Sequence, residues 1–121
     1  MARILLIDDS PTALAIVKFI LGSHCAVERL DNFAAIPAYL ARTPPDLVLL
    51  DINMPAISGP AVARFIRKNQ QKHIPILLYS GLSESEIRST ARDINADGWV
   101  TKGDNGKLRA EVAQHLPPET V

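Results

Sequence analysis

The chain has 121 residues, of which 47% are hydrophobic and 21% are charged, and its thirteen basic and thirteen acidic side chains cancel. This length and composition fit one globular domain and argue against a disordered segment. Without an excess of basic residues, the sequence lacks the electrostatic footprint of direct nucleic-acid binding.

Membrane insertion and export also find no support in the sequence. The apolar part of the N-terminus ends at Asp8 after only four residues, which is too short for a signal peptide, and no apolar stretch approaches membrane-spanning length. Cys25 is the only cysteine, so the chain forms no intrachain disulfide. These features favour a protein of the reducing cytoplasm.

Strand-like and helix-like segments alternate along the chain, which predicts an α/β fold with a parallel sheet. Strands are predicted at residues 3–7, 25–30, 47–50, 76–79 and 98–101, and helices at residues 11–21, 33–42, 60–69, 84–94 and 106–116. We therefore expect a single domain over residues 1–121, with a core at 2–116 and a short tail at 117–121 that begins at Pro117-Pro118.

The first predicted helix has both a start and a stop signal. Ser10 is a good N-cap residue, Pro11 tolerates the first helical position, and Gly22 follows the last apolar residue. The helix is therefore expected to begin after Ser10 and to close at Gly22.

The other helix starts are less uniform. Gly59-Pro60 predicts the start of the third helix, and Ser83 with Glu86 has the spacing of a capping box for the fourth. Pro37 falls inside the second helix, where its ring would clash with the preceding turn. We expect the second helix to start late or to be distorted.

The apolar patterns of the strands predict their order. Residues 4–7, 47–50 and 76–79 are apolar without alternation, as in strands covered by helices on both faces. Residues 25–30 and 98–101 include polar side chains and suit the sheet edges. Right-handed crossovers then allow a doubly wound, five-stranded sheet of order 2-1-3-4-5, whose ligand site lies beyond the carboxyl ends of the first and third strands.

Polar side chains follow these strands where each one ends: Asp8 and Asp9, Asp51, Ser80 and Lys102. Three carboxylates at one sheet edge repel one another unless they are protonated or neutralised, and Mg²⁺ accepts carboxylate, water and phosphate oxygens. The alternative is that the aspartates only make local turn hydrogen bonds. The convergence of three acids with a hydroxyl and a lysine favours a site for a metal ion and a phosphoryl group.

Taken in order, Ile7-Asp8-Asp9-Ser10, the stretch from Asp51 to Gly59, Ser80-Gly81 and Lys102 resemble the receiver domain of two-component response regulators. The resemblance covers residues 2–116 and implies the flavodoxin-like (βα)5 receiver fold. It also implies that Asp51 is the phosphoacceptor and that a phosphohistidine on a histidine kinase or phosphotransfer protein is the donor.

The resemblance extends to the metal site. It implies that Asp9 is the principal Mg²⁺ ligand, that Asp8 assists through water, and that Asp51 and the backbone carbonyl of Asn53 complete the protein ligands. The ion would shield Asp51 from the incoming phosphoryl charge.

The resemblance also implies how phosphorylation is sensed. Lys102 would contact the phosphoryl oxygens, the Ser80 hydroxyl would move to bond them, and Trp99 would be the switch aromatic that swings inward with Ser80. Gly103 departs from the family pattern, which usually has proline after the lysine. Because glycine is less restricted than proline, we expect a more flexible loop into the last helix.

The leading hypothesis is a phosphorylation-driven switch: Mg²⁺-dependent transfer to Asp51 alters a surface on the last strand and last two helices and thereby a downstream effector. Such a chain phosphorylates itself once and is not a turnover enzyme. The alternatives are a receiver-like interaction module that works without phosphorylation and a hydrolase with an aspartyl-phosphate intermediate. The hydrolase is disfavoured because no insertion could enclose a substrate. Dimerisation through the last two helices stays open.

Overall fold

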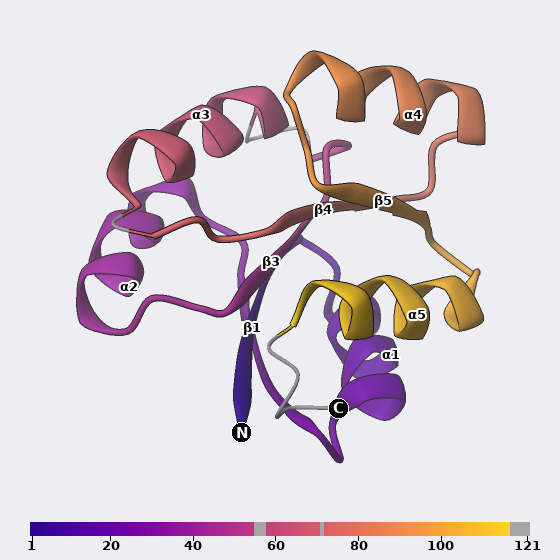
Figure 1. Cartoon of the computed structure of the whole chain (residues 1–121), viewed down its shortest axis with the longest axis horizontal. Coiled ribbons are helices and arrows are strands. Elements are labelled where there is room, and N and C mark those ends of the chain that lie inside the picture. Colours follow the sequence, from indigo (N-terminus) through magenta and orange to yellow (C-terminus); the bar gives the residue numbers. More distant parts are fainter. Residues whose placement is uncertain (55–57, 71, 117–121) are drawn as a thin grey trace.

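The computed structural model describes residues 1–54, 58–70 and 72–116. Its five parallel strands form one sheet of order β2-β1-β3-β4-β5 (Figure 1). The strands are β1 (Ala2–Ile7), β2 (Cys25–Leu30), β3 (Leu47–Leu50), β4 (Ile76–Ser80) and β5 (Gly98–Thr101), and the helices are α1 (Pro11–Leu21), α2 (Ile36–Arg42), α3 (Gly59–Asn69), α4 (Glu84–Asp93) and α5 (Asn105–His115). The predicted fold class and strand order are confirmed.

Pro37 affects the second helix as expected. A 3-10 turn at Phe33–Ala35 comes first, and α2 then starts at Ile36 with Pro37 in its first turn. The helix therefore starts three residues later than the predicted range, and the proline occupies a position where no intrahelical N–H is needed.

The caps of α1 and α4 agree with the sequence. The Ser10 hydroxyl accepts a hydrogen bond from the Ala13 N–H at 3.2 Å, and the Gly22 N–H donates to the Lys18 carbonyl at 2.7 Å. At the predicted capping box of α4, the Ser83 hydroxyl accepts a hydrogen bond from the Glu86 N–H at 3.3 Å and donates one to Glu86 Oε1 at 2.8 Å.

The start of α3 differs slightly from the prediction. Gly59 is already the first helical residue, and the cap is Ser58, whose hydroxyl accepts from the Ala61 N–H at 3.3 Å. Gly59 is needed for a packing reason, because a Cβ there would lie 2.7 Å from Ile52 Cγ2 and 3.1 Å from Ile52 Cα.

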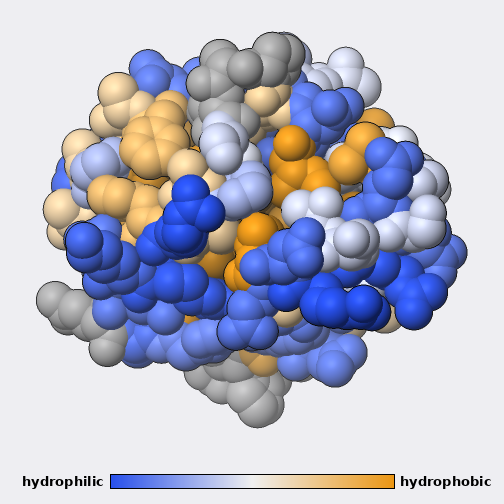
Figure 2. Space-filling model, turned by 90° about the horizontal axis from the view of Figure 1, so that it is seen from above, coloured by the Kyte–Doolittle hydropathy of each residue, from blue (hydrophilic) through white to orange (hydrophobic). Residues whose placement is uncertain are grey.

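Two hydrophobic clusters sandwich the sheet. Residues of α1 and α5 pack on one face, and residues of α2, α3 and α4 pack on the other (Figure 1). The residues of β3 are fully buried, as predicted for a central strand. The face in Figure 2, on the side of α3 and α4, is hydrophilic mainly along its lower part and exposes hydrophobic surface near its centre and toward the upper left.

Within the described ranges, no helix has the length and apolar character required to cross a membrane. The tail predicted at 117–121 and residues 55–57 of the Asp51-to-Gly59 motif lie outside the described part of the chain.

Candidate functional site

The polar residues predicted to gather at the carboxyl edge of the sheet do so, and backbone hydrogen bonds fix their positions. The Asp8 N–H donates to the Leu30 carbonyl at 3.1 Å, and the Asp51 N–H donates to the Ile7 carbonyl at 2.9 Å. The Lys102 N–H donates to the Ser80 carbonyl at 2.8 Å. The backbone hydrogen bonds of the sheet thus continue one residue beyond β1, β3 and β5, and they place Asp8, Asp51 and Lys102 in one crevice.

The three carboxylates are close enough to share one ion. Asp8, Asp9 and Asp51 each offer an oxygen, and these atoms lie within 4.8 Å of one another. Asp8 and Asp51 are buried and Asp9 is exposed. The predicted group therefore combines two buried carboxylates with one at the solvent side.

Each buried carboxylate has one oxygen held by its own turn. Asp8 Oδ1 accepts from the Ser10 N–H at 2.9 Å, and Asp51 Oδ1 accepts from the Asn53 N–H at 2.8 Å. The local turn bonds considered as an alternative are therefore present, but they use only one oxygen of each side chain. The Oδ2 atom of each is left for the crevice.

Lys102 faces both of these remaining oxygens. Its Nζ lies 2.8 Å from Asp8 Oδ2 and 3.3 Å from Asp51 Oδ2. Burial by itself would lower the pKa of Lys102, but the contacts with Asp8 and Asp51 outweigh it and raise that pKa. The lysine is a permanent cation at neutral pH and offsets part of the acidic charge.

The donor set fits a hard divalent cation. Asp8 Oδ2 is buried, and the Lys102 ammonium at 2.8 Å is its ion-pair partner among the described residues. Burial raises the pKa of Asp8, and the contact with Lys102 only partly offsets that effect. An additional cation at Asp8, Asp9 and Asp51 would compensate this desolvated charge with the oxygen ligands that Mg²⁺ prefers.

The remaining predicted residues surround this group. Asn53 is exposed directly after the Asp51 turn. The buried Ser80 hydroxyl accepts from the Leu82 N–H at 3.3 Å. Trp99 is half-buried, packs against the cluster of α2, α3 and α4, and has Lys107 over its ring.

Two contacts were missed by the sequence reasoning. Arg29 Nη1 donates to the backbone carbonyl of Asp8 at 3.1 Å, and the Tyr79 ring centroid lies 5.6 Å from Lys102 Nζ. The predicted strand order could have suggested the first contact, because Arg29 is near the end of the predicted strand 25–30, which lies beside the first strand. Tyr79 gave no signal, since an aromatic residue in a buried run is normally read as core.

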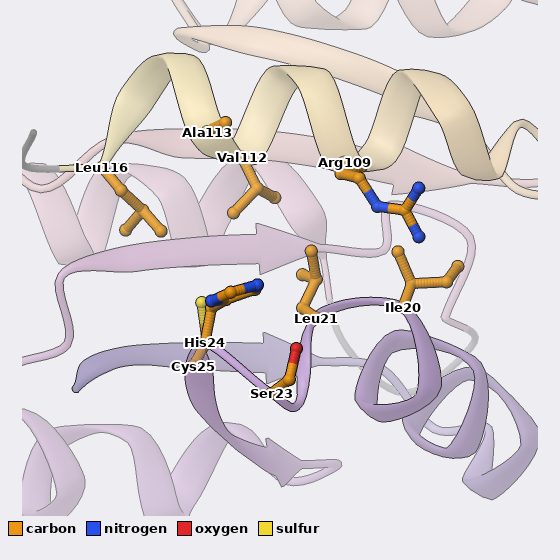
Figure 3. Close-up of a pocket in the computed structure, with 9 residues that line it drawn as sticks. All are labelled: Ile20, Leu21, Ser23, His24, Cys25, Arg109, Val112, Ala113 and Leu116. Atoms are coloured by element: carbon orange, nitrogen blue, oxygen red, sulfur yellow. The ribbon is translucent and has the colours of Figure 1, made fainter. Parts of the chain in front are cut away.

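A separate pocket of about 400 Å³ lies between α1 and α5 (Figure 3). Its lining includes Leu21, Val112 and Leu116 around Cys25, the first residue of β2. Because the strands are parallel, Cys25 marks the sheet edge opposite the carboxylates. The pocket is therefore not part of the acidic site.

Known proteins share both sequence and fold with this chain. The family model of the response regulator receiver domain matches residues 4–113. A probable cyclic di-GMP phosphodiesterase of Vibrio cholerae serotype O1 is 34% identical over 115 residues, covering 93% of this chain and 26% of that protein.

Two solved structures have the same fold. The BeF3-activated receiver domain of Klebsiella pneumoniae RstA has a TM-score of 0.80 and 27% identity, covering 93% of this chain and 97% of that chain. Vibrio cholerae chemotaxis protein CheY4 has a TM-score of 0.82 and 25% identity, covering 96% and 99%.

The chain spans only 26% to 35% of the length of the first curated relatives, so the likeness concerns one part of those proteins. Within that part, the family match covers the whole crevice from Asp8 to Lys102. The chain belongs to the receiver domains of two-component response regulators.

Proposed function

We propose that Asp51 accepts a phosphoryl group in a Mg²⁺-dependent reaction and that this modification switches the protein between two states. The proposal rests on the contacts of the two oxygens of the Asp51 carboxylate. Its Oδ1 is held by the Asn53 N–H at 2.8 Å, while Oδ2 faces the crevice beside Asp8, Asp9 and Lys102. A carboxylate held in this way is a usable nucleophile toward an activated phosphoryl group.

The transfer conserves charge and atoms. An Asp51 oxygen bonds to phosphorus while the P–N bond of a donor phosphohistidine breaks, and the departing imidazole keeps the electron pair and takes up a proton from water. Lys102, already 3.3 Å from Asp51 Oδ2, would contact the transferred phosphoryl oxygens. Mg²⁺ held by Asp8, Asp9, Asp51 and the Asn53 carbonyl would neutralise the charge that develops on those oxygens.

Ser80 and Trp99 are the proposed readers of this change. Ser80 ends the strand next to β5. Among the described residues its hydroxyl is bonded by the Leu82 N–H, and it would give up that bond to turn toward a phosphoryl oxygen. Trp99 lies on β5, whose backbone pairs with β4 up to Ser80. Movement of the hydroxyl can therefore bias the position of the indole and of the neighbouring surface.

The biological setting follows as part of the same proposal. The donor would be a histidine kinase or histidine phosphotransfer protein of the cytoplasm, and the modified surface would act on an effector protein or domain. The domain would span residues 1–121. It would accept one phosphoryl group on Asp51 and would not turn over small substrates.

Incubation with acetyl phosphate and Mg²⁺, followed by intact-mass measurement, tests the assignment. The wild type should gain one phosphoryl group, and Asp51→Ala should gain none. Asp93→Asn, which changes an exposed aspartate of α4, is the matched control and should be labelled like the wild type. Equal labelling of Asp51→Ala and wild type would overturn the proposal.

A further inference from the structure

Lys107 covers the ring of Trp99, the only tryptophan of the chain. Its Nζ lies 2.9 Å from the ring centroid, well inside the range of a cation–π contact. Trp99 packs against the cluster formed with α2, α3 and α4, whereas α5, which carries Lys107, packs on the opposite sheet face. The side chain must therefore reach around the edge strand β5, which lies between α4 and α5 in Figure 1.

The position of Lys107 in its helix is unfavourable by itself. It is the third residue of α5, and its N–H donates to the N-cap carboxylate of Asp104 at 3.1 Å. The positive end of the helix dipole favours acidic residues in this turn and disfavours a lysine. A residue that breaks a local rule is expected to have a compensating contact elsewhere. For Lys107 that contact is the indole ring.

The connection between β5 and α5 is anchored at both ends, by Lys102 in the crevice and by the buried Leu108, and two glycines lie between these anchors. Gly103 adopts a left-handed φ of 101°, and a Cβ at Gly103 or Gly106 would meet nothing within 4 Å. The Asp104 N–H donates to the Thr101 carbonyl at 3.1 Å. Glycine restricts the backbone least, so between Lys102 and Leu108 the contact of the Lys107 side chain with Trp99 on β5 adds a restraint that the two glycines do not provide.

We propose that Lys107 is a positioning residue that holds Trp99 in its resting orientation and ties the start of α5 to β5. In this arrangement the contact of Lys107 with Trp99 restrains the backbone at a point where Gly103, unlike a proline, does not. The consequence for switching rests on the proposed phosphorylation of Asp51: any movement of the indole away from Lys107 also releases the start of α5. The cation–π contact thus links Trp99 to the helix that follows it.

The resting contact can be tested without phosphorylation. Protons close to the face of an indole ring are shifted upfield, so in NMR spectra the ε-methylene protons of Lys107 should stand upfield of those of Lys68, an exposed lysine of α3. Trp99→Leu should abolish the shift. Lys107→Ala should increase quenching of Trp99 fluorescence by acrylamide, and Lys107→Arg, which retains a cation able to stack, should restore the wild-type value.

The link to switching is tested by the single indole N–H signal. With acetyl phosphate and Mg²⁺ the wild-type signal should move to a new position, and in unmodified Lys107→Ala it should already lie part of the way along that path. A cation–π contact of this kind corresponds to a shift of about two- to five-fold in the ratio of the two states. Lys68→Ala is the control and should leave the signal unchanged.

The outcomes separate this inference from the proposed function. If the wild type does not respond to acetyl phosphate but Lys107 shows the upfield shift, the resting contact stands and the phosphorylation switch fails. If the wild type responds while Lys107 shows no upfield shift and Lys107→Ala leaves both quenching and the indole signal unchanged, the inference about Lys107 is wrong. A circular dichroism melt of each variant shows whether it remains folded.

Discussion

At the residue scale, Lys102 is held by two kinds of contact. Its ammonium pairs with Asp8 and Asp51, and it also lies 5.6 Å from the ring centroid of the buried Tyr79. Burial raises the pKa of the Tyr79 hydroxyl, so the ring stays neutral and its face can attract the cation. We therefore predict that the Tyr79 ring helps to orient Lys102.

Replacing Tyr79 by leucine should slow phosphorylation by acetyl phosphate about two- to five-fold, the equivalent of about 0.5–1 kcal/mol of cation–π attraction. Tyr79→Phe keeps the ring and should react at the wild-type rate. Initial rates of phosphoprotein formation, followed by mass spectrometry, provide the measurement. Equal rates for leucine and phenylalanine variants would show that the ring face does not act on Lys102.

At the element scale, Asp97 joins three segments at the sheet edge opposite the carboxylates. Its Oδ2 accepts from the Ile76 N–H at 2.7 Å and from Arg67 Nη2 at 2.6 Å, and its Oδ1 lies 2.8 Å from His73 Nε2. Burial alone would raise the pKa of Asp97, but these hydrogen bonds outweigh it and hold that pKa below the ordinary value of 3.8. The ionised carboxylate therefore stabilises the fold.

The sign of the resulting pH dependence is determined by the lowered pKa. The contribution of Asp97 is complete above its ordinary, unfolded pKa of 3.8 and is lost as the pH falls through the lower folded value. Urea unfolding at pH 7 should give Asp97→Asn a free energy of unfolding about 2 kcal/mol below the wild type. The difference should shrink as the pH is lowered below about 4; a constant difference would contradict the assignment.

Two helical glycines, Gly59 and Gly106, differ in the space available for a side chain and allow a paired test. A Cβ at Gly59 would meet Ile52 Cγ2 at 2.7 Å, whereas a Cβ at Gly106 would meet nothing within 4 Å. Gly59→Ala should lower the free energy of unfolding by about 1–3 kcal/mol through overpacking. Gly106→Ala should raise it by about 0.5–1 kcal/mol, because alanine is the better helix former. Thermal melts of both variants check the opposite signs.

At the scale of the whole molecule, the acidic crevice brings together carboxylates from separate parts of the chain. Asp8 and Asp9 follow β1, while Asp51 follows β3, and these side chains converge only in the folded sheet. A cation bound there stabilises the fold by mass action, since the unfolded chain holds no such group.

Addition of Mg²⁺ at a hundred times its dissociation constant should therefore raise the free energy of unfolding by about 2.7 kcal/mol. Asp9→Asn should lose most of this gain because it removes the exposed carboxylate of the group, whereas Asp93→Asn should retain it. Melting curves with Mg²⁺ and with EDTA measure the effect. A gain of the same size in Asp9→Asn would place the ion elsewhere.

Much of the fold and of the candidate site could be predicted because their signals are local. Continuous apolar runs such as residues 47–50 indicate strands buried on both faces, and the polar residues Asp8, Asp51 and Lys102 mark where three of the strands end. Parallel strands place their carboxyl ends at one edge, so the convergence of these residues follows from the strand order alone. Ser58 was missed as the α3 cap because Gly59-Pro60 offered a competing start signal.

The sequence by itself therefore determined the strand order and the identity of the acids at the crevice, since both depend on residue type and position along the chain. Only the tertiary structure decided which carboxylate oxygens face Lys102 and which aromatic rings meet Lys102 and Lys107. Those contacts depend on side-chain rotamers and on packing between segments far apart in the chain, such as Asp51 and Lys102. No local pattern of residues encodes that geometry.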